Sequence, residues 1–469
     1  MAVKPKKRLE ITELNTEGLP EAIYTLESNT DNVEKRSAKT SAPAATSLLR
    51  RCTNAFLPVG YPSTVTPDYT PYQVYDSAQA FASTIAGLLA SRAVFVGMGV
   101  GSEDASLVTT MLLYIAQETI GRVATILFAH QFSQRIAAEV KFYRFFADIV
   151  NDVAFVLDCM SPGMPIIGRV LTLCVSNACR AMCGVAAGSS KAILSAHFAK
   201  ADNIGELNAK DGSQETMLSL LGMWVGSLVV SKVHGTVATW SCLIPLLALH
   251  LWANWKAVKS VRLNSLNTER AHILFCGVLE GKTMGLDNVN QEESILRPSA
   301  PAVRMGVSFE KFFSFMHDTV GGQSESHVYE YFGHLLEMFA REDYLLWFDM
   351  RSNRGMVLLK ASATSETQAK SFCHMIRCRH QRGSLTESIR KGLTKQENFN
   401  AISQSAIDGA AEIPCQVIVA TLQQNNQEWS EICDQAQDLG WNLDLTNLVQ
   451  GQGCRIQVGD GAGNNKKDR

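Results

Sequence analysis

Apolar and polar positions are unevenly distributed along this chain, and its longest uncharged apolar stretch is the most informative. The stretch covers residues 233–255, with Val233 and Trp255 at its ends, and contains no Asp, Glu, Lys or Arg. At about 1.5 Å per residue, a helix of this length spans about 34 Å and can cross a hydrocarbon core of about 30 Å. His250, Trp252 and Trp255, followed by basic residues, are typical of a membrane–water boundary. We therefore predict a transmembrane helix. The alternative is a buried helix of a large soluble protein, because polar and small residues dilute the stretch.

Helical patterns extend over most of residues 75–280, where Ala, Val, Leu and Gly are abundant. Charged residues interrupt most of these runs, which indicates helices packed in a bundle. Glu118 and Arg122 are four residues apart and can pair on one helix face. Two glycine pairs have a spacing that lets helices approach closely: Gly184 and Gly188, and Gly222 and Gly226. The predicted helices cover residues 75–96, 106–130, 139–159, 165–187, 191–201, 214–231, 233–259 and 265–277.

The pattern changes near both ends of the chain, which predicts several domains. Residues 1–50 have few large apolar side chains, so we predict a disordered tail. A helical membrane domain should cover 51–281 and a linker 282–303. Beyond it, strands at 344–350 and 356–360, followed by helices, indicate a soluble domain at 304–469 with a polar linker at about 381–411. The predicted fold class is mainly α, a membrane-associated helical bundle followed by a small α+β C-terminal domain.

Composition and motifs exclude several function classes. A formal net charge of -2 argues against nucleic-acid binding, which needs a basic surface. The twelve cysteines lack zinc-type spacing, and we expect reduced, mostly buried thiols. The N-terminus has no apolar run of the kind found in a secretory signal. No catalytic or nucleotide-binding motif is convincing, and no metal site or cofactor is indicated.

The first candidate site is a polar stripe on the predicted helix 139–159. Arg144, Asp148 and Asp152 are spaced four residues apart, and the other faces of the helix are aromatic and apolar. If the helix is buried, these side chains must be paired or line a wet cavity, and they could bind a cation or a polar solute. A solvated surface face is the alternative.

The second candidate site is the dense polar block at residues 197–215. We interpret it as a rigid loop whose Asp211 or Ser213 begins the next helix, and which could form a gate or ligand site at the membrane edge. An ordinary surface loop is the alternative. We expect the block to form one site with the stripe, where Lys200 adds positive charge. Its candidate residues are His197, Asn203, Lys210, Asp211, Ser213, Gln214 and Glu215.

The third group is basic and polar and follows the predicted span. It could bind anionic lipid head groups or an acidic partner, and ordinary membrane anchors would have the same composition. Its members are Asn254, Lys256, Lys259, Arg262, Asn267 and Arg270. The excess of basic residues after the span predicts that the Lys256 end lies on the cytosolic or equivalent side.

Several motifs in this part of the chain resemble those of the Root UVB Sensitive family. They are FLPVGYP at 56–62, VTPDY at 65–69, RFFADIVND at 144–152, HFA at 197–199, AKDGSQE at 209–215 and HLWANWKAV at 250–258. The resemblance is strong over residues 50–280 and weak in the C-terminal domain. It implies a membrane-associated protein without a known enzymatic reaction, so we expect no enzyme. Plant members are linked to root light responses, seedling development, auxin transport and vitamin B6 status.

These observations lead to a membrane protein that transports a small solute or organises a membrane complex. A peripheral adaptor without translocation activity is the second interpretation, and a soluble metabolic enzyme is the third. The expected partners are membrane lipid and another family member or a second copy of this chain, with no nucleic acid. The sequence does not indicate which cellular membrane contains the protein.

Overall fold

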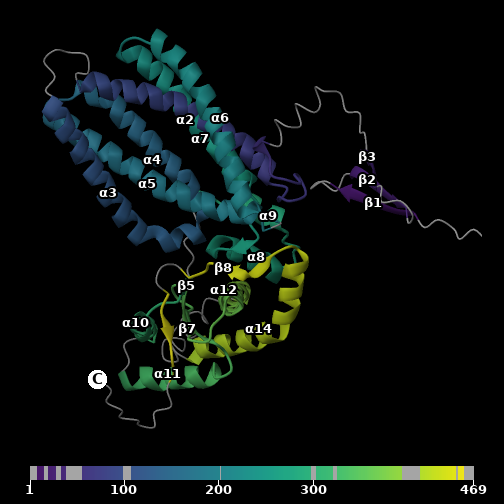
Figure 1. Ribbon diagram of the computed structural model, residues 1–469. Helices are drawn as coiled ribbons and strands as arrows, with labels where there is room; N and C mark the ends of the chain where they lie inside the picture. Colours follow the sequence, from purple (N-terminus) through teal and green to yellow (C-terminus); the bar gives the residue numbers. More distant parts are fainter. Residues whose placement is uncertain are drawn as a thin grey trace, which may run out of the picture. The chain divides into compact units, whose positions relative to one another are not determined.

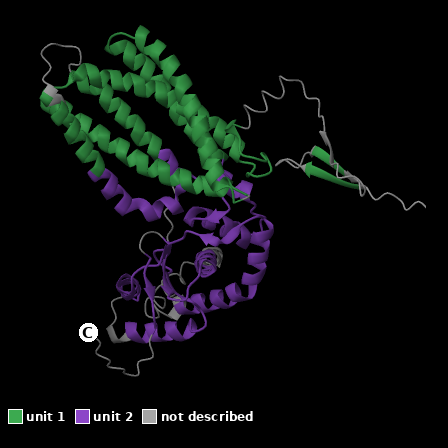
Figure 2. Cartoon of the chain, in the orientation of Figure 1, with its two compact units in different colours: residues 1–122, 147–260 green, residues 123–146, 261–469 purple. Residues whose placement is uncertain are grey.

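The chain is mainly helical, and a computed structural model shows how its helices are arranged (Figure 1). The structure describes residues 8–14, 20–27, 33–37, 55–98, 107–200, 202–296, 303–320, 325–392, 412–449 and 453–458. The chain forms two compact units. Unit 1 comprises residues 1–122 and 147–260, and unit 2 comprises residues 123–146 and 261–469 (Figure 2).

Unit 1 is built from long helices that follow one another through short connections, so successive helices run in opposite directions. In chain order the helices are α2 (Tyr69–Gly97), α3 (Leu107–Ala138), α4 (Val140–Met160), the short 3-10 helix η1 (Ser161–Gly163), α5 (Ile166–Phe198), α6 (Ile204–Lys232) and α7 (Thr236–Ser260). The C-terminal half of α3 and the first residues of α4 belong to unit 2. Helix α2 packs against both α6 and α7. The predicted helical bundle is confirmed.

The close contact between α2 and α6 depends on the glycine pair at 222 and 226. A Cβ atom at Gly222 would lie 2.9 Å from Thr84 Cβ, and one at Gly226 would lie 2.5 Å from Leu88 Cδ1. Glycine is therefore needed at Gly222, while a Cβ atom at Gly226 would require the end of the Leu88 side chain to move, so the close approach that the spacing predicted is present. The second predicted pair, Gly184 and Gly188, has no described atom within 4 Å of an added Cβ.

Several helix ends differ from the predictions. Helix α7 begins at Thr236 because the chain reverses at Gly235, whose φ of 82° suits glycine, so Val233 lies outside the helix. Residues 166–198 form one helix, α5, where we predicted a break. Helix α6 begins ten residues before the predicted start at Gln214. Tertiary contacts of Asp211, described below, stabilise this additional helix.

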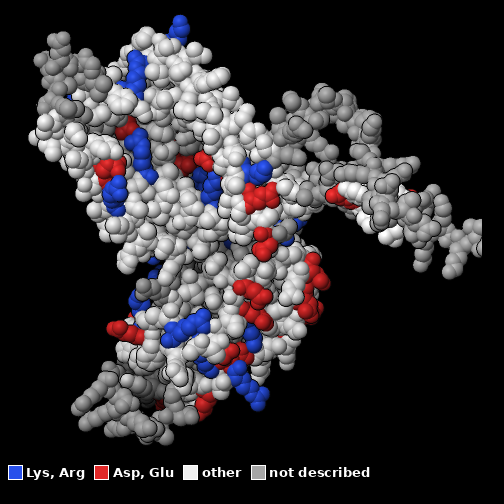
Figure 3. Space-filling view, in the orientation of Figure 1, with Lys and Arg blue, Asp and Glu red and all other residues white. Residues whose placement is uncertain are grey.

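Four helices are long and apolar enough to cross a membrane: Tyr69–Gly97, Met111–Ala138, Ile166–Phe198 and Thr236–Ser260. The predicted span is among them. Charged residues interrupt the other apolar helices, and these residues have partners nearby in the structure. The predicted Glu118–Arg122 pair forms, with 3.6 Å between Oε2 and Nη2. Much of the visible surface of unit 1 carries no charged atoms (Figure 3). Large apolar side chains of unit 1 such as Ile115, Ile167 and Trp224 are exposed.

Unit 2 contains the predicted α+β fold. Its core sheet has β7 (Arg354–Lys360) between β5 (Val303–Met305) and β6 (Tyr344–Asp349), with β9 (Arg455–Ile456) pairing with β7. Strands β4 (Ser265–Leu266) and β8 (Asn442–Thr446) pair in parallel. The surrounding helices are α8 (Thr268–Leu279), α9 (Leu286–Glu292), α10 (Phe309–Thr319), α11 (Glu325–Met338), α12 (Ser365–Gly392) and α14 (Glu412–Asp438).

The core of unit 2 is apolar and includes residues from both sides of the predicted linker at 282–303. Leu274 and Phe275 of α8 are buried in the same cluster as Trp347, Phe348 and Phe372. The boundary between the units therefore lies at residue 260, before α8, and the predicted linker falls inside unit 2.

The N-terminal segment contains three strands where we predicted a disordered tail. Strands β1 (Arg8–Leu14), β2 (Pro20–Glu27) and β3 (Val33–Ser37) form an antiparallel sheet in the order β1-β2-β3. Apolar and polar residues alternate from Arg8 to Thr12 in β1, and Ile11 pairs with Tyr24 of β2. The prediction was wrong for these strands because it used average composition and ignored this period of two.

Candidate functional site

The acidic stripe of α4 lies inside unit 1. Asp148 and Asp152 are each only 5% exposed, and Arg144, one turn earlier on the same helix, is 7% exposed. The interpretation of the stripe as a solvated surface face is therefore wrong. The aromatic and apolar side chains of α4 require this helix to be enclosed, and its carboxylates are enclosed with it.

The partners of the two carboxylates come from α2 and α7. His250 Nδ1 lies 2.7 Å from Asp152 Oδ1, and His250 Nε2 lies 3.8 Å from Asp148 Oδ2. Gln79 Nε2 and Asn254 Nδ2 donate hydrogen bonds to Asp148 Oδ2. One imidazole thus lies between two carboxylates. We call these five residues, Gln79, Asp148, Asp152, His250 and Asn254, the Asp–His network.

The Asp–His network lies near the middle of the helices that form it. Gln79 is ten residues from the start of α2, Asp148 eight from the start of α4, and His250 ten from the end of α7. These offsets correspond to about 12–15 Å along each helix axis. The second carboxylate oxygen of Asp152, Oδ2, is buried and accepts no hydrogen bond within the described part of the chain. The network can therefore hold a proton or accept a hydrogen bond from a solute.

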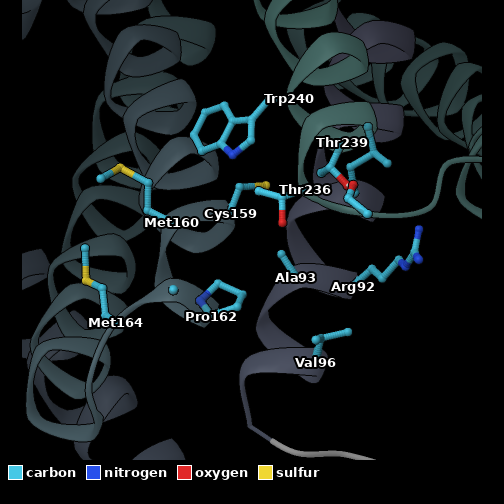
Figure 4. A pocket seen from close by; sticks show the side chains of 13 residues that line it. Arg92, Ala93, Val96, Cys159, Met160, Pro162, Met164, Thr236, Thr239 and Trp240 are labelled. Atoms are coloured by element: carbon cyan, nitrogen blue, oxygen red, sulfur yellow. The ribbon is translucent and has the colours of Figure 1, made fainter.

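A cavity of about 450 Å³ lies toward the other end of the same three helices. It is lined by Leu89 and Val96 of α2, Met160 of α4, and Thr236 and Trp240 of α7, among others. Trp240 extends from α7 toward α4 above this cavity (Figure 4).

A basic side chain, Arg92 of α2, marks one edge of the cavity. Its Nη1 donates to the carbonyl oxygens of Val230, at 3.1 Å, and Val233. These two hydrogen bonds give partners to backbone carbonyl oxygens at the C-terminal end of α6, which have no partner within the helix. Much of the positive charge of Arg92 is therefore used within the fold.

Between the cavity and the Asp–His network lies a layer of apolar side chains. Ala86 and Ala90 of α2, Phe155 of α4 and Leu243 of α7 are buried in one cluster with Cys159. In sequence, Ala86, Phe155 and Leu243 lie between the network residues and the cavity residues of their helices, and Ala90 directly follows Leu89 of the cavity lining. The three helices therefore present, in order, a polar network, an apolar layer and a cavity. We call Ala86, Ala90, Phe155 and Leu243 the apolar layer.

The second candidate site is helical, and the structure gives it different partners from those of the stripe. Asp211 lies inside α6 and accepts from Gln73 Nε2 at 2.5 Å and from Lys191 Nζ at 2.7 Å. Lys191 Nζ also lies 2.7 Å from Glu215 Oε2. Asp211 therefore links α2, α5 and α6. The prediction that it begins a helix was wrong because these tertiary contacts outweigh its local turn preference.

The other residues of this block fasten the proline-rich segment 55–69 to the bundle. His197 Nε2 lies 2.9 Å from Asp68 Oδ2, and Gln214 Nε2 donates to the Phe56 carbonyl at 2.6 Å. Lys210 Nζ donates to the carbonyl of Ala55 at 3.4 Å. Ser213 Oγ bonds the Ala209 carbonyl in its own helix, and Asn203 is the residue before α6. These contacts indicate a structural role for the block.

The basic and polar group that we expected after the predicted span also separates into different environments, and three of its members, Asn254, Lys256 and Lys259, lie within α7. Asn254 belongs to the Asp–His network, and Lys256 is exposed. Lys259 is half-buried in the last turn of α7, and Arg262 Nε lies 3.0 Å from Asp287 Oδ1. Asn254 was therefore wrongly assigned to the membrane surface.

Asn267 and Arg270 lie in a buried ionic cluster of unit 2 and were also wrongly assigned to the surface. Arg270 Nη1 lies 2.6 Å from Glu293 Oε1, and Lys141 Nζ lies 2.7 Å from Glu293 Oε2. Asn267 Nδ2 donates to Glu139 Oε2 at 3.2 Å. Burial raises the pKa of Glu139 to about 7, although the positive charge of Arg270 opposes this shift.

The eleven described cysteines are free thiols, of which five are buried, five are half-buried and Cys454 is exposed, so the expectation that most are buried was wrong. Among the described residues, no group of three or more His, Cys, Asp or Glu side chains is placed to hold a metal ion.

Sequence reasoning identified the acids of the Asp–His network but not their partners. His250 was interpreted as part of a membrane-boundary motif, and Gln79 was not selected. Both are polar residues within long apolar helices, and this is the signal that could have found them.

Comparison with known proteins identifies the family. A protein-family model described as "Vitamin B6 photo-protection and homoeostasis domain" matches residues 42–282. "Protein root UVB sensitive 3" of Arabidopsis thaliana is 32% identical over 270 residues, which are 57% of this chain and 61% of the relative. "RUS family member 1" of Dictyostelium discoideum is 35% identical over 259 residues, 54% of this chain and 49% of the relative.

These two matches span less than two thirds of the relatives' own lengths. A longer match, 23% identical over 426 residues, is to "Protein root UVB sensitive 2, chloroplastic" of Arabidopsis thaliana and covers 88% of this chain and 86% of the relative. No solved structure matches the chain. The family model matches more than half of the chain and covers all the helices of unit 1, so the chain belongs to the Root UVB Sensitive family.

Proposed function

We propose that this chain is an integral membrane transporter that moves a small polar solute through unit 1 and couples this movement to protonation of the Asp–His network. The single observation that supports the proposal most is the network itself. Two carboxylates of α4 and an imidazole of α7 are buried together beside α2 and α7, two helices that are long and apolar enough to cross a membrane. Ionisable groups at this depth are costly, and they commonly mark substrate or proton pathways.

The arrangement of the apolar layer supports the same proposal. A transporter must close one side of its site while the other is open, and an apolar layer between a polar site and a cavity provides such a barrier. Phe155 and Leu243 form this barrier in unit 1. The cavity of about 450 Å³ lies beyond it and is large enough for a small organic solute.

The chemistry of the network favours a neutral or cationic solute with hydrogen-bond donors. Two carboxylates outnumber the one imidazole, so with both acids ionised the site is negative whether His250 is protonated or neutral, and Asp152 Oδ2 can accept a further hydrogen bond. The family description refers to vitamin B6 homoeostasis, so pyridoxine, a small pyridine with several hydroxyl groups, is the first solute to test. The proposal involves no bond-making reaction.

Extraction of membranes with carbonate tests the first part of the proposal. An integral protein stays in the pellet, because its spans are held by apolar burial rather than by surface charge. Recovery of the full chain in the supernatant would instead support a peripheral adaptor.

Transport by the purified chain in proteoliposomes tests the second part. Uptake of labelled pyridoxine and acidification of the lumen are measured with and without a pH gradient. Asp148→Asn should abolish both signals, because the amide cannot exchange a proton, while the protein still accumulates in the membrane. The matched control is Asp287→Asn, at a half-exposed aspartate of unit 2, which should transport normally.

Two outcomes contradict a transport role for the network. If Asp148→Asn lowers abundance and activity in proportion, and a compensating change at a basic partner restores both, the stripe is a structural ion pair. Uptake that Asp148→Asn leaves unchanged shows that the solute passes without this network.

A further inference from the structure

A second cavity, of about 440 Å³, lies in unit 2 and is separate from the Asp–His network. Strand β5, the turn that follows it and the start of α10 form one wall, and Thr268, Leu448 and Cys454 contribute to the rest. Gly306 is at the centre of this turn, with a φ of 62°. A Cβ atom there would lie 2.9 Å from Val449 Cγ1, so glycine is needed to keep the turn in place.

The charged residues that line this cavity are all basic. They are Arg135 of α3, Arg304 of β5 and Lys311 of α10, and no acidic side chain is among the described lining residues. All three side chains are exposed rather than buried. Three cations around one cavity repel one another, and an anion between them removes this repulsion. The cavity thus has the charge complement of a dianion.

The backbone around the cavity also favours the binding of an anion. Ser308 precedes α10, and its side chain accepts a hydrogen bond from the Lys311 backbone N–H at 3.4 Å. The positive end of the α10 dipole and the N–H groups of its first turn therefore face the same region as the Lys311 side chain. Val303, Met305, Val307 and Leu448 supply apolar walls that can hold the carbon part of a ligand.

We propose that this cavity binds a phosphate monoester, with Arg135, Arg304 and Lys311 around the phosphate. A phosphate monoester carries close to two negative charges at neutral pH and accepts the paired hydrogen bonds that arginine donates. Two sources share this chemistry. Arg135 is three residues before Ala138, the end of a candidate span, so a phosphomonoester lipid such as phosphatidic acid could reach it from the bilayer. A soluble phosphorylated metabolite is the other source.

Calorimetric titration of the purified full chain in a neutral detergent tests the proposal. The probes are glycerol 3-phosphate for the soluble source and dihexanoyl phosphatidic acid for the lipid source, with glycerol and dihexanoyl phosphatidylcholine as uncharged or zwitterionic counterparts. We expect the phosphomonoesters to bind and their counterparts not to bind. Arg304→Gln and Lys311→Gln should each weaken binding by about tenfold, the value of one charge-assisted hydrogen bond.

The control variant is Arg341→Gln, at an exposed arginine of unit 2 that does not line the cavity. Since all these side chains are exposed, the variants should unfold at the same temperature as the parent. Binding of glycerol 3-phosphate assigns a soluble ligand, and binding of only the phosphatidic acid assigns a lipid. Binding of neither probe overturns the proposal. An equal loss in Arg341→Gln also overturns it, because it shows attraction to net charge rather than to this cavity.

Discussion

Replacement of His250 tests whether the Asp–His network is one energetic unit. His250 is 1% exposed, and its two ring nitrogens lie 2.7 Å and 3.8 Å from oxygens of Asp152 and Asp148. His250→Gln keeps a hydrogen-bond donor of similar size but removes the positive charge that the imidazole can carry. Two buried carboxylates then lie close together without a cation between them.

The cost can be worked out from these contacts. Removing one partner of a buried ionic pair costs about 3–5 kcal/mol, and the hydrogen bond that glutamine can still donate returns about 1 kcal/mol. We therefore expect His250→Gln to destabilise the folded protein by about 2–4 kcal/mol. For a unit of this size, such a loss lowers the melting temperature by roughly 4–16 °C.

A double-mutant cycle in detergent, followed by tryptophan fluorescence during heating, measures the coupling. Asp152→Asn removes one of the two carboxylates. The double variant His250→Gln/Asp152→Asn should therefore lose less unfolding free energy than the two single variants lose together, by about 1–3 kcal/mol. His317→Gln is the control, because His317 faces Asp318 at 3.8 Å on the surface and should shift the melting temperature little. Additive single losses would refute the network as a coupled unit.

Three further predictions test other parts of the structure. Burial raises the pKa of Glu139 to about 7, so the folded state prefers the protonated form, and the stabilising contribution present below pH 4.5 is lost as the pH rises to 7. Glu139→Gln should remove this loss and raise the melting temperature at pH 8 relative to the parent, but not at pH 4.5. Gly226→Leu should separate α6 from α2 and reduce the free energy of unfolding by about 1–3 kcal/mol or more, which is measured as a lower melting temperature. The same change at Gly184 should cost less, because an added Cβ there meets no described atom within 4 Å. Cysteine introduced at Ser260 should react with a membrane-impermeant reagent only from the cytosolic or equivalent side, and labelling from the opposite side alone would contradict the predicted orientation.

The sequence was a good guide to the helices of unit 1 and to the sheet and helices of unit 2. Helical and strand periodicity are local properties, and each segment contains the pattern that determines its own structure. Helix α4 shows this well, because its aromatic faces and its polar stripe are both evident within 21 residues. The same local evidence predicted close packing at Gly222 and Gly226.

The partners of the polar residues could not be predicted in the same way. Asp152 and His250 are 98 residues apart in sequence, and Asp148 and Asn254 are 106 apart. No local pattern specifies such a pairing. Local chemistry was even misleading at Asp211, where an Asp-Gly-Ser sequence favours a turn. Contacts with Gln73 and Lys191 from two other helices place Asp211 inside α6 instead.

The same three helices supply every element of the proposed transport path, and this suggests how protonation and opening are coupled. Helix α4 carries Asp152 and, three residues further, Phe155. Helix α7 carries His250 and, seven residues earlier, Leu243. Protonation of the carboxylates weakens their attraction to the imidazole and so weakens the contact between α4 and α7. Because Phe155 and Leu243 are rigidly attached to these helices, a movement that separates His250 from Asp152 must also change the apolar layer. Under the transport proposal, α4 and α7 each carry one residue of the network and one residue of the apolar layer. Protonation of the network can therefore open the apolar layer without direct contact between the proton and Phe155 or Leu243.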